Sequence, residues 1–308
     1  MIPANYTQLY NDYLKGNKKA LARIISLVEN QVEGYAEILQ LLPASATPVI
    51  GITGPPGAGK STLVDALIEY WVGMGKNIGV LCVDPSSPFN LGALLGDRIR
   101  MSNWYTHPQV FIRSLATRGS LGGLHPAIIE IADVMKAAGF DYVVVETVGV
   151  GQSEIEIAGL ADTTVVVVVP EAGDEVQTMK AGLMEIADVF VVNKADRPDA
   201  DMFARNLRLM MAPAFMAKTH EIAIVKTEAN NKKGIDTLGL AIQHHLETLT
   251  GANERRFWLL TEKAWHIIQA HRMQNLSKKL LMQEIKTYWE TSGESPNLYR
   301  YIAPYLQT

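Results

Sequence analysis

Short runs of Val and Ile alternate along most of the chain with longer segments in which apolar residues recur at helical spacing. The Val/Ile runs predict strands at residues 48–53, 78–84, 109–113, 141–146, 163–169, 188–193 and 222–226. Several runs are uninterrupted, and the stretch 164–169 reads T-V-V-V-V-V, as expected for a strand buried on both faces of a parallel sheet. The alternation predicts a doubly wound α/β domain with a mostly parallel sheet, in which ligands bind at the carboxyl ends of the strands.

Both ends of the chain lack this alternation. Residues 1–46 carry an apolar stripe at helical spacing and predict a helical extension packed on the main domain, which we place at residues 47–252. Residues 253–308 again show only helical periodicity, and this C-terminal helical segment either packs on the domain or forms an oligomer contact. The stripes that support the two extensions are Leu21, Ile24, Ile25 and Val28, then Phe257, Leu260, Ala264 and Ile268.

The composition narrows the class of protein. With 48% apolar residues in a chain of 308, a sizeable core is expected. The 28 basic and 32 acidic residues leave a net charge of −4, which argues against a nucleic-acid or membrane surface. Cys82, the single cysteine, cannot form an internal disulfide or a multi-cysteine metal site, and its apolar surroundings predict a buried, inert thiol. The first residues lack a signal-peptide pattern and no apolar run reaches membrane-spanning length, so we expect a cytoplasmic protein; an organellar protein whose transit peptide was removed would look the same.

A phosphate-binding motif follows the first predicted strand. Residues 54–61 read G-P-P-G-A-G-K-S and fit G-x-x-x-x-G-K-[ST], between an apolar strand and a helical run. Glycines let successive main-chain N–H groups turn toward the phosphates, and the helix N-terminus adds partial positive charge. We expect Lys60 to reach the β- and γ-phosphates and the Ser61 hydroxyl to bind Mg²⁺. The nucleotide-binding residues predicted here are Gly54, Pro55, Pro56, Gly57, Ala58, Gly59, Lys60, Ser61 and Thr62.

A second motif predicts that the base of the nucleotide is guanine. Residues 193–196 read N-K-A-D at the end of a predicted strand, which is the N-K-x-D pattern of GTPases. The carboxylate of Asp196 can accept hydrogen bonds from guanine N1–H and the 2-amino group, a pair of donors that adenine lacks. We expect Asn193 to tie the base loop to the phosphate loop and Lys194 to lie along the base.

A third loop supports the guanine prediction. Thr227, Glu228 and Ala229 follow the short strand at 222–226, where GTPases usually place a Ser-Ala-like loop. Such a loop directs main-chain N–H groups at guanine O6, and main-chain donation does not depend on the side chains present. All three residues are therefore predicted to bind the nucleotide.

Acidic residues near strand ends predict the metal and γ-phosphate site. Residues 146–149 read E-T-V-G where GTPases carry D-x-x-G, so we expect Glu146 to hold Mg²⁺ directly or through water and the Gly149 N–H to meet the γ-phosphate. Asp84 and Asp97 are further candidate ligands, for which a turn cap and a solvated helix carboxylate are the respective alternatives. The predicted catalytic residues are Lys60, Glu146 and Gly149, and the predicted metal ligands are Ser61, Asp84, Asp97 and Glu146.

The groups that activate the attacking water are not evident. Gln152 is a candidate for orienting water on spacing alone, and an ordinary surface-loop glutamine is the alternative. Four arginines could act as an arginine finger and none stands out: Arg98, Arg100, Arg113 and Arg118. We therefore expect slow intrinsic hydrolysis unless a partner completes the site.

Six motifs together resemble the MeaB/ArgK GTPases, which are associated with methylmalonyl-CoA mutase. They read G-P-P-G-A-G-K-S at 54–61, V-D-P-S-S-P at 83–88, G-D-R-I-R-M at 96–101, T-R-G-S-L-G-G at 117–123, E-T-V-G-V-G-Q-S-E at 146–154 and N-K-A-D at 193–196. The glutamate at position 146 marks the wider metallochaperone-type GTPases. The resemblance covers roughly residues 10–290 and is densest through 50–235.

The resemblance implies a function that the spacing of residues does not show. Members of the family are G proteins that chaperone a B12-dependent acyl-CoA mutase, gate adenosylcobalamin loading and protect the mutase from inactivation. They are usually homodimers that use C-terminal helices, and their Mg²⁺ contacts map to Ser61, Asp97 and Glu146, with Asp84 nearby. The loop at 170–180 resembles a third switch, in which Asp174, Gln177 and Lys180 would signal to the partner; an ordinary strand-to-helix loop is the alternative.

Two other functions fit parts of the sequence. A nickel-inserting GTPase would normally show His-rich or Cys-containing metal motifs, whereas the seven histidines here are scattered and His244–His245 is the single adjacent pair. A P-loop small-molecule kinase would not need a guanine reader. Within the resemblance, both methylmalonyl-CoA and isobutyryl-CoA mutases are possible clients.

Overall fold

The computed structural model describes residues 6–84, 101–117, 124–147, 153–172, 182–215, 222–249, 251, 254–273, 276–293 and 297–306. The chain divides into two compact units, Met1–Phe257 and Trp258–Thr308. Among the helices of these described ranges, none has the length and apolar character that crossing a membrane requires.

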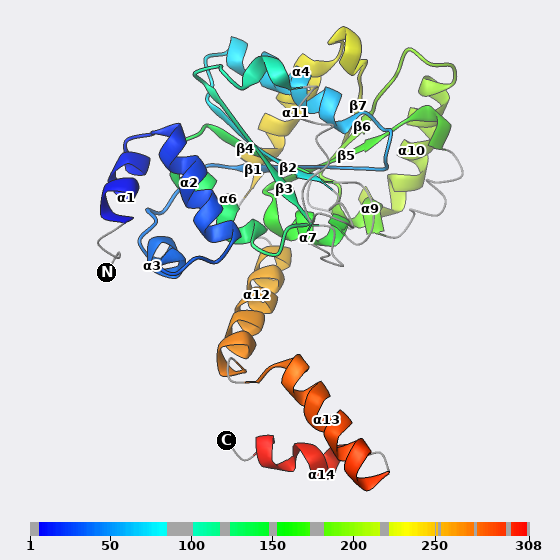
Figure 1. Cartoon of the computed structure of the whole chain (residues 1–308). Coiled ribbons are helices and arrows are strands. Elements are labelled where there is room, and N and C mark those ends of the chain that lie inside the picture. Colours follow the sequence, from blue (N-terminus) through cyan, green and yellow to red (C-terminus); the bar gives the residue numbers. More distant parts are fainter. Residues whose placement is uncertain are drawn as a thin grey trace. The chain divides into compact units, whose positions relative to one another are not determined.

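A seven-stranded parallel sheet in the order β3-β2-β4-β1-β5-β6-β7 forms the centre of the larger unit (Figure 1). The strands are β1 (Val49–Thr53), β2 (Ile78–Asp84), β3 (Val110–Ala116), β4 (Tyr142–Glu146), β5 (Thr163–Val168), β6 (Val189–Val192) and β7 (Ala223–Lys226). The predicted doubly wound α/β fold is confirmed. β3 runs further than predicted because it pairs with β2 as far as Asp84 and Ala116, although polar Arg113 and Ser114 interrupt its apolar pattern.

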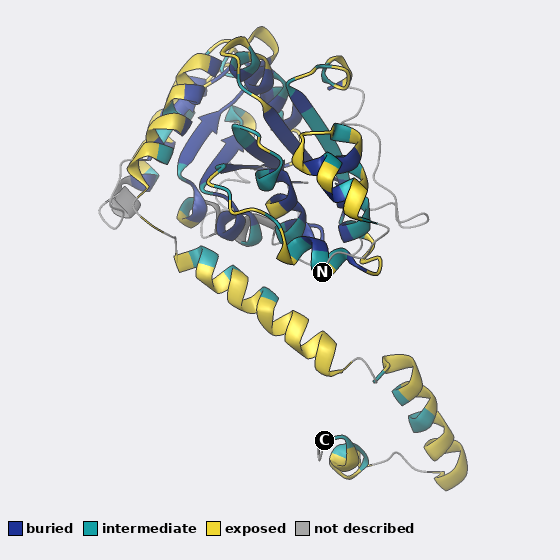
Figure 2. Ribbon diagram, turned by 90° about the vertical axis from the view of Figure 1, so that its left-hand side faces the viewer, coloured by how far each residue is buried: buried dark blue, intermediate teal, exposed yellow. Residues whose placement is uncertain are grey.

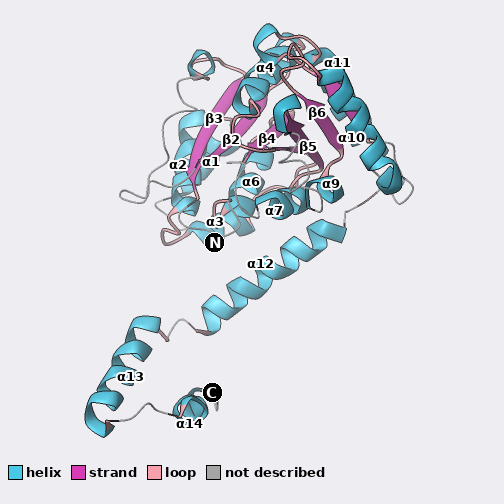
Figure 3. Cartoon of the chain, turned by 90° about the vertical axis from the view of Figure 1, so that its right-hand side faces the viewer, coloured by secondary structure: helices cyan, strands magenta, loops and turns pink. Residues whose placement is uncertain are grey.

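Helices cover both faces of the sheet, which explains why its central strands read as continuous apolar runs (Figures 1 and 3). Alternate residues of β5 show the two faces: Val165 and Val167 belong to one buried core, and Val166 and Val168 to the other. One face carries α4 (Lys60–Gly73) and α11 (Ile235–Thr248), and the other carries α6 (Ile128–Ala137), α7 (Ser153–Leu160), α9 (Gly182–Ile186) and α10 (Ala200–Phe215).

The N-terminal helices are part of the larger unit. They are α1 (Thr7–Leu14), α2 (Lys18–Glu29) and α3 (Tyr35–Gln40), and α2 packs against α6. The predicted stripe of α2 is buried, with Ile24, Ile25 and Val28 each 0% exposed. The Tyr13 hydroxyl also donates to the Val134 carbonyl of α6 at 2.9 Å. These contacts attach the extension to α6, one of the helices that cover the sheet.

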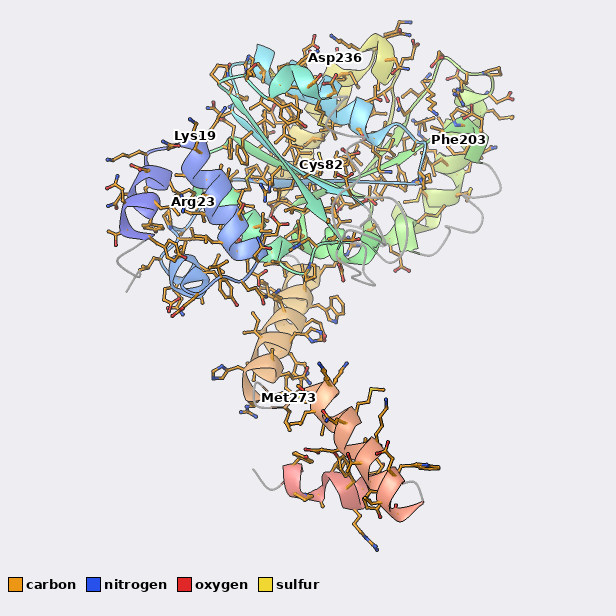
Figure 4. All side chains as sticks on the ribbon, viewed as in Figure 1. Lys19, Arg23, Cys82, Phe203, Asp236 and Met273 are labelled. Carbon is orange, nitrogen blue, oxygen red and sulfur yellow. The ribbon has the colours of Figure 1, made fainter. Side chains whose placement is uncertain are left out.

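Cys82 lies within the sheet, in β2, and is 1% exposed (Figure 4). Its strand is buried along its whole length, with Val80 and Leu81 at 0%. The predicted burial of this thiol is confirmed.

The smaller unit is helical and exposes much of its apolar surface. It contains most of α12 (Glu254–Arg272), with α13 (Lys278–Ser292), α14 (Leu298–Ile302) and η5 (Ala303–Leu306). None of the described residues of α12, α13 or α14 is buried, as Figure 2 shows for α12 and α13. The hydroxyls of Tyr301 and Tyr305 both donate to Glu284 Oε2, at 2.6 and 2.7 Å, and so attach the last helical turns to α13. The Tyr301 hydrogen bond, followed by that of Tyr305, lowers the pKa of the Glu284 carboxyl.

Candidate nucleotide site

The loop between β1 and α4 has the main-chain conformation that its glycines predict. Gly54, Gly57 and Gly59 have φ values of +143°, +78° and +88°, in the region that favours glycine. A Cβ on Gly54 would lie 2.1 Å from the Val167 carbonyl oxygen, and one on Gly59 would lie 2.5 Å from Asn193 Nδ2. The first and last of these glycines are thus required by close neighbours as well as by the turn.

Lys60 begins α4 and is only 7% exposed. Its ammonium lies against the loop itself, donating to the Gly54 carbonyl at 2.9 Å and the Pro55 carbonyl at 3.1 Å. Phosphate oxygens are stronger acceptors than carbonyls for such charged donors. The lysine is therefore held at the place where the motif predicts phosphate.

An oxygen-rich cluster lies beside the start of α4. The Ser61 hydroxyl donates to Glu146 Oε1 at 2.6 Å, and both residues are buried, at 7% and 4% exposure. Asp84 is also buried, at 6%, and ends β2, the strand next to β4 that Glu146 ends. The structure thus gathers at one sheet edge three of the four predicted metal ligands; the fourth, Asp97, lies outside the described residues.

The donor set of this cluster is suited to Mg²⁺. The described part of the chain contains no group of three or more His, Cys, Asp or Glu side chains that could hold a metal ion. Mg²⁺ is commonly bound by one or two carboxylates together with phosphate oxygens, rather than by a cage made of protein alone. The hydroxyl of Ser61 and the carboxylates of Glu146 and Asp84 supply hard oxygen ligands of that kind.

Several other predicted residues cannot be placed. Gly149, Gln152, Asp174, Gln177, Lys180, Arg98, Arg100 and Arg118 lie outside the described residues. The fourth arginine is placed, and it serves a different purpose: Arg113 donates to Glu29 Oε2 at 2.6 Å and to Ser26 Oγ at 3.1 Å, which ties β3 to α2. The prediction that Arg113 could act as an arginine finger is therefore wrong, because its guanidinium binds Glu29 and Ser26 of the N-terminal extension.

Asn193 joins the base loop to the phosphate loop, as its motif predicts. Its Nδ2 donates to the Ala58 carbonyl at 2.9 Å, while its Oδ1 accepts from Thr227 Oγ1 at 3.0 Å and from the Ala229 N–H at 3.2 Å. Asn193 and Thr227 are 2% and 1% exposed, so water does not replace these bonds easily. One side chain thus connects three loops that lie far apart in the sequence.

A pocket of about 170 Å³ opens between these loops. It is lined by Gly59, Thr62, Asn193, Lys194, Asp196, Glu228, Ala229, Asn230 and Asn231. Lys194 adopts a left-handed main chain with φ of +56°, and the next N–H, of Ala195, donates to the Thr227 carbonyl at 3.0 Å. The structure therefore brings the two predicted base-binding loops to the walls of one pocket beside the P-loop.

Sequence reasoning missed two of the three asparagines that line this pocket. Asn230 and Asn231 directly follow the predicted Thr-Glu-Ala loop and form part of η4 (Ala229–Asn231). Asn231 Nδ2 donates to Glu228 Oε2 at 2.9 Å. This hydrogen bond, and then that from Lys233, lowers the pKa of the Glu228 carboxyl. A pair of amides next to a base loop was the signal that could have identified them.

Two buried threonines next to the phosphate loop were also missed. The hydroxyls of Thr53, at the end of β1, and Thr147, just after β4, are 2.9 Å apart. Both residues are at most 2% exposed, and the Thr147 N–H donates to the Ile52 carbonyl at 3.0 Å. They join the strand that leads into the P-loop to the strand that carries Glu146.

The adjacent histidines do not form a metal site together. His244 is exposed, whereas His245 is buried at 5% and its Nδ1 lies 2.8 Å from Thr163 Oγ1. The His245 Nε2 lies 3.7 Å from Asp188 Oδ1, at the amino ends of β5 and β6. This arrangement packs α11 on the sheet at the edge opposite the nucleotide pocket.

Comparisons with known proteins agree with this geometry. The family model described as "Methylmalonyl Co-A mutase-associated GTPase MeaB" matches residues 21–284. A putative GTPase of Pyrococcus abyssi is 51% identical over 243 residues, which cover 76% of this chain and 74% of that protein. GTPase ArgK of Escherichia coli is 36% identical over 248 residues, with 77% and 75% covered.

Two more distant relatives extend these similarities. A mouse protein named "Methylmalonic aciduria type A homolog, mitochondrial" is 29% identical over 317 residues, with 96% of this chain and 74% of that protein covered. Among solved structures, that of an "LAO/AO transport system kinase" superposes with a TM-score of 0.64 over 100% of both chains. At 24% identity, the solved structure shows a shared fold alone.

Proposed function

Because the chain belongs to the MeaB family of methylmalonyl Co-A mutase-associated GTPases, we propose that it is the chaperone of a B12-dependent acyl-CoA mutase. In this proposal it gates adenosylcobalamin loading and protects or reactivates the mutase. The GTPase activity itself follows from the family and from relatives named GTPase at 51% and 36% identity.

The observation that carries the proposed use of guanine nucleotides is the joint at Asn193. Its hydrogen bonds to Ala58, Thr227 and Ala229 place the pocket that contains Asp196 next to the P-loop. A base in that pocket and phosphates on the P-loop would belong to one nucleotide. Asp196 would then select guanine through the N1–H and 2-amino donors.

The phosphate end of the site is assigned to the residues that the P-loop gathers. Lys60 would leave the Gly54 and Pro55 carbonyls and donate to the β- and γ-phosphates, stabilising the charge that develops during transfer. Ser61, Glu146 and Asp84, with Asp97, would hold Mg²⁺. When bound, the ion would neutralise charge between the β- and γ-phosphates. We assign the main-chain hydrogen bond to the γ-phosphate to the N–H of Gly149.

We further propose a homodimer that uses residues 253–308. Trp258 and Trp265 are seven positions apart on α12, so they share a face of the helix, and they are 54% and 58% exposed. Large aromatic side chains on an open helix face suit the core of an interface between chains. Met282 and Trp289, seven apart on α13, are exposed in the same way, at 58% and 52%.

The choice of a mutase as the client rests on membership of the MeaB family and on the name of the mouse relative, which refers to methylmalonic aciduria. The test is steady-state GTP turnover alone and with purified methylmalonyl-CoA mutase or isobutyryl-CoA mutase from the same organism. We expect the client to accelerate turnover by a large factor, on the order of a hundredfold, because a partner can order the site. Lys60→Ala serves as the control that no client should rescue. Equal turnover with and without either mutase would leave a GTPase with a different client.

The loop at 170–180 is our candidate relay to the mutase. Gln177→Ala and Lys180→Ala should leave basal turnover unchanged and remove the acceleration by the client. A loss of basal turnover in these variants would instead place the two residues in the nucleotide site.

A further inference from the structure

A second pocket, of about 240 Å³, opens at the edge of the sheet opposite the nucleotide site. Asn77, Pro108 and Phe140 of its wall lie just before β2, β3 and β4, so this is the amino edge of the parallel sheet. Since one water occupies about 30 Å³ in the liquid, the pocket has room for a small organic molecule. The residues that line it are Tyr13, Gly16, Lys18, Leu21, Asn77, Pro108, Ala138, Gly139 and Phe140.

Much of the pocket wall is apolar. The N-terminal extension contributes Tyr13 and Leu21, which are 1% and 3% exposed. On the side of the sheet, Phe140 is half-buried and stacks on Phe111 of β3, with ring centroids 6.3 Å apart. The Tyr13 hydroxyl already donates to the Val134 carbonyl at 2.9 Å, so its ring is fixed in place. These side chains suit the apolar part of a ligand.

Among the described residues that line the pocket, Lys18 carries the only formal charge. Its Nζ donates to the carbonyls of His107 and Val110, at 2.9 and 2.8 Å, which uses two of its three N–H donors. It forms no ion pair with any residue that the structure describes. Burial lowers the pKa of Lys18, because the charged ammonium is partly removed from water. An anion in the pocket would offset that cost.

A second donor on the pocket wall is the side-chain amide of Asn77. One of its N–H groups lies 3.5 Å from Asp141 Oδ2, and the other has no acceptor among the described residues. Asp141 itself is held by Lys76 at 3.2 Å and by the Asn77 main-chain N–H at 2.8 Å. That carboxylate therefore serves Lys76 and does not act as the counter-charge of Lys18.

We propose that this pocket binds a small organic monocarboxylate, whose carboxylate meets the Lys18 ammonium and the Asn77 amide while its apolar chain contacts Tyr13, Leu21 and Phe140. A carboxylate supplies one negative charge for one uncompensated positive charge and accepts from both donors. A phosphate would bring a second charge that no lining residue balances. The inference does not depend on nucleotide binding, because the two pockets share no lining residue.

Hexanoate is the probe for this site. Hexanol and hexylammonium have the same chain length, without charge and with the opposite charge. Dissociation constants are measured by saturation-transfer NMR on the full-length protein. Lys18→Gln removes the charge but keeps N–H donors, Lys18→Arg keeps the charge, and Ala138→Leu fills part of the pocket. Lys19→Gln is the matched control, because Lys19 is the next residue of α2 and is exposed (Figure 4).

We expect hexanoate to bind the parent and Lys19→Gln with a dissociation constant of about 1 mM, an ordinary affinity for a ligand of this size. Hexanol and hexylammonium should bind at least about tenfold more weakly, because neither supplies the counter-charge. Lys18→Gln and Ala138→Leu should each weaken hexanoate by about tenfold or more, and Lys18→Arg by about threefold or less. GDP affinity and the thermal unfolding temperature without hexanoate show that each variant is folded.

No binding of hexanoate to the parent up to about 20 mM would overturn the inference. Equal affinities for hexanoate and hexanol would also overturn it, since an apolar seam between the extension and the sheet does not distinguish the two. So would an unchanged affinity for hexanoate in Lys18→Gln or in Ala138→Leu. If Lys18→Gln does not fold, Ala138→Leu and the comparison of hexanoate with hexylammonium decide the question.

Discussion

Replacing Asn193 by Ala tests whether the joint between the base loop and the phosphate loop governs nucleotide affinity. The substitution removes three hydrogen bonds, to Ala58, Thr227 and Ala229, from a side chain that is 2% exposed. At about 1 kcal/mol for each such bond, the loss is about 3 kcal/mol. If binding must restore the order that these bonds provided, the dissociation constant for GDP rises by about a hundredfold.

A graded variant makes this prediction specific. Thr227→Val keeps the shape of the side chain but removes one bond of the three, to Asn193 Oδ1. We expect its GDP affinity to fall by about fivefold, in proportion to about 1 kcal/mol. Fluorescence titration with a labelled GDP measures both variants, and thermal unfolding without nucleotide shows that each is folded. Asn193→Ala binding GDP within threefold of the parent would refute the reasoning.

Four further changes address the rest of the site and the proposed dimer. Asp196→Asn should weaken GTP binding and admit xanthosine nucleotides, and competition titrations against ATP should show that the parent strongly favours GTP; equal GTP and ATP affinities would contradict this. Lys60→Ala should abolish hydrolysis, and Glu146→Ala should reduce Mg²⁺-dependent turnover more than GDP binding. Unchanged turnover of Glu146→Ala at saturating GTP and Mg²⁺ would remove that residue from the site. Trp258→Ala with Trp265→Ala should convert a dimer into a monomer by light scattering at micromolar concentration, and a monomeric parent would count against the dimer.

The elements of the fold could be predicted because they depend on local patterns. The strands read as Val/Ile runs since both faces of the sheet are covered, so burial imposes an apolar residue at nearly every position. The predicted β3 ended too early because its second half is not a continuous apolar run. It lies at one of the two edges of the sheet, and Arg113 and Ser114 are accommodated in it without loss of the pairing to β2. Hydropathy does not distinguish a polar edge strand from a loop.

The P-loop and the N-K-A-D sequence also identified the chemistry of the site without coordinates. Each motif is a contiguous segment whose main-chain shape follows from its own residues, such as Gly54 with φ of +143°. The spacing of residues did not show which of the candidate side chains are held by partners elsewhere in the fold. Arg113, for example, was one of four candidates for an arginine finger, and the structure shows that it forms an ion pair with Glu29.

The sequence by itself determined the doubly wound fold, the phosphate loop and the segment that contains Asp196, because local periodicity and short motifs encode them. Only the tertiary structure decided how distant residues share the work. Ser61 meets Glu146, 85 residues away, and Asn193 meets Ala58, 135 residues away. The N–H groups of the loop at 227–229 are engaged by partners that no sequence pattern indicates. Such contacts depend on which strand ends lie side by side in the sheet, and that order is a property of the folded chain.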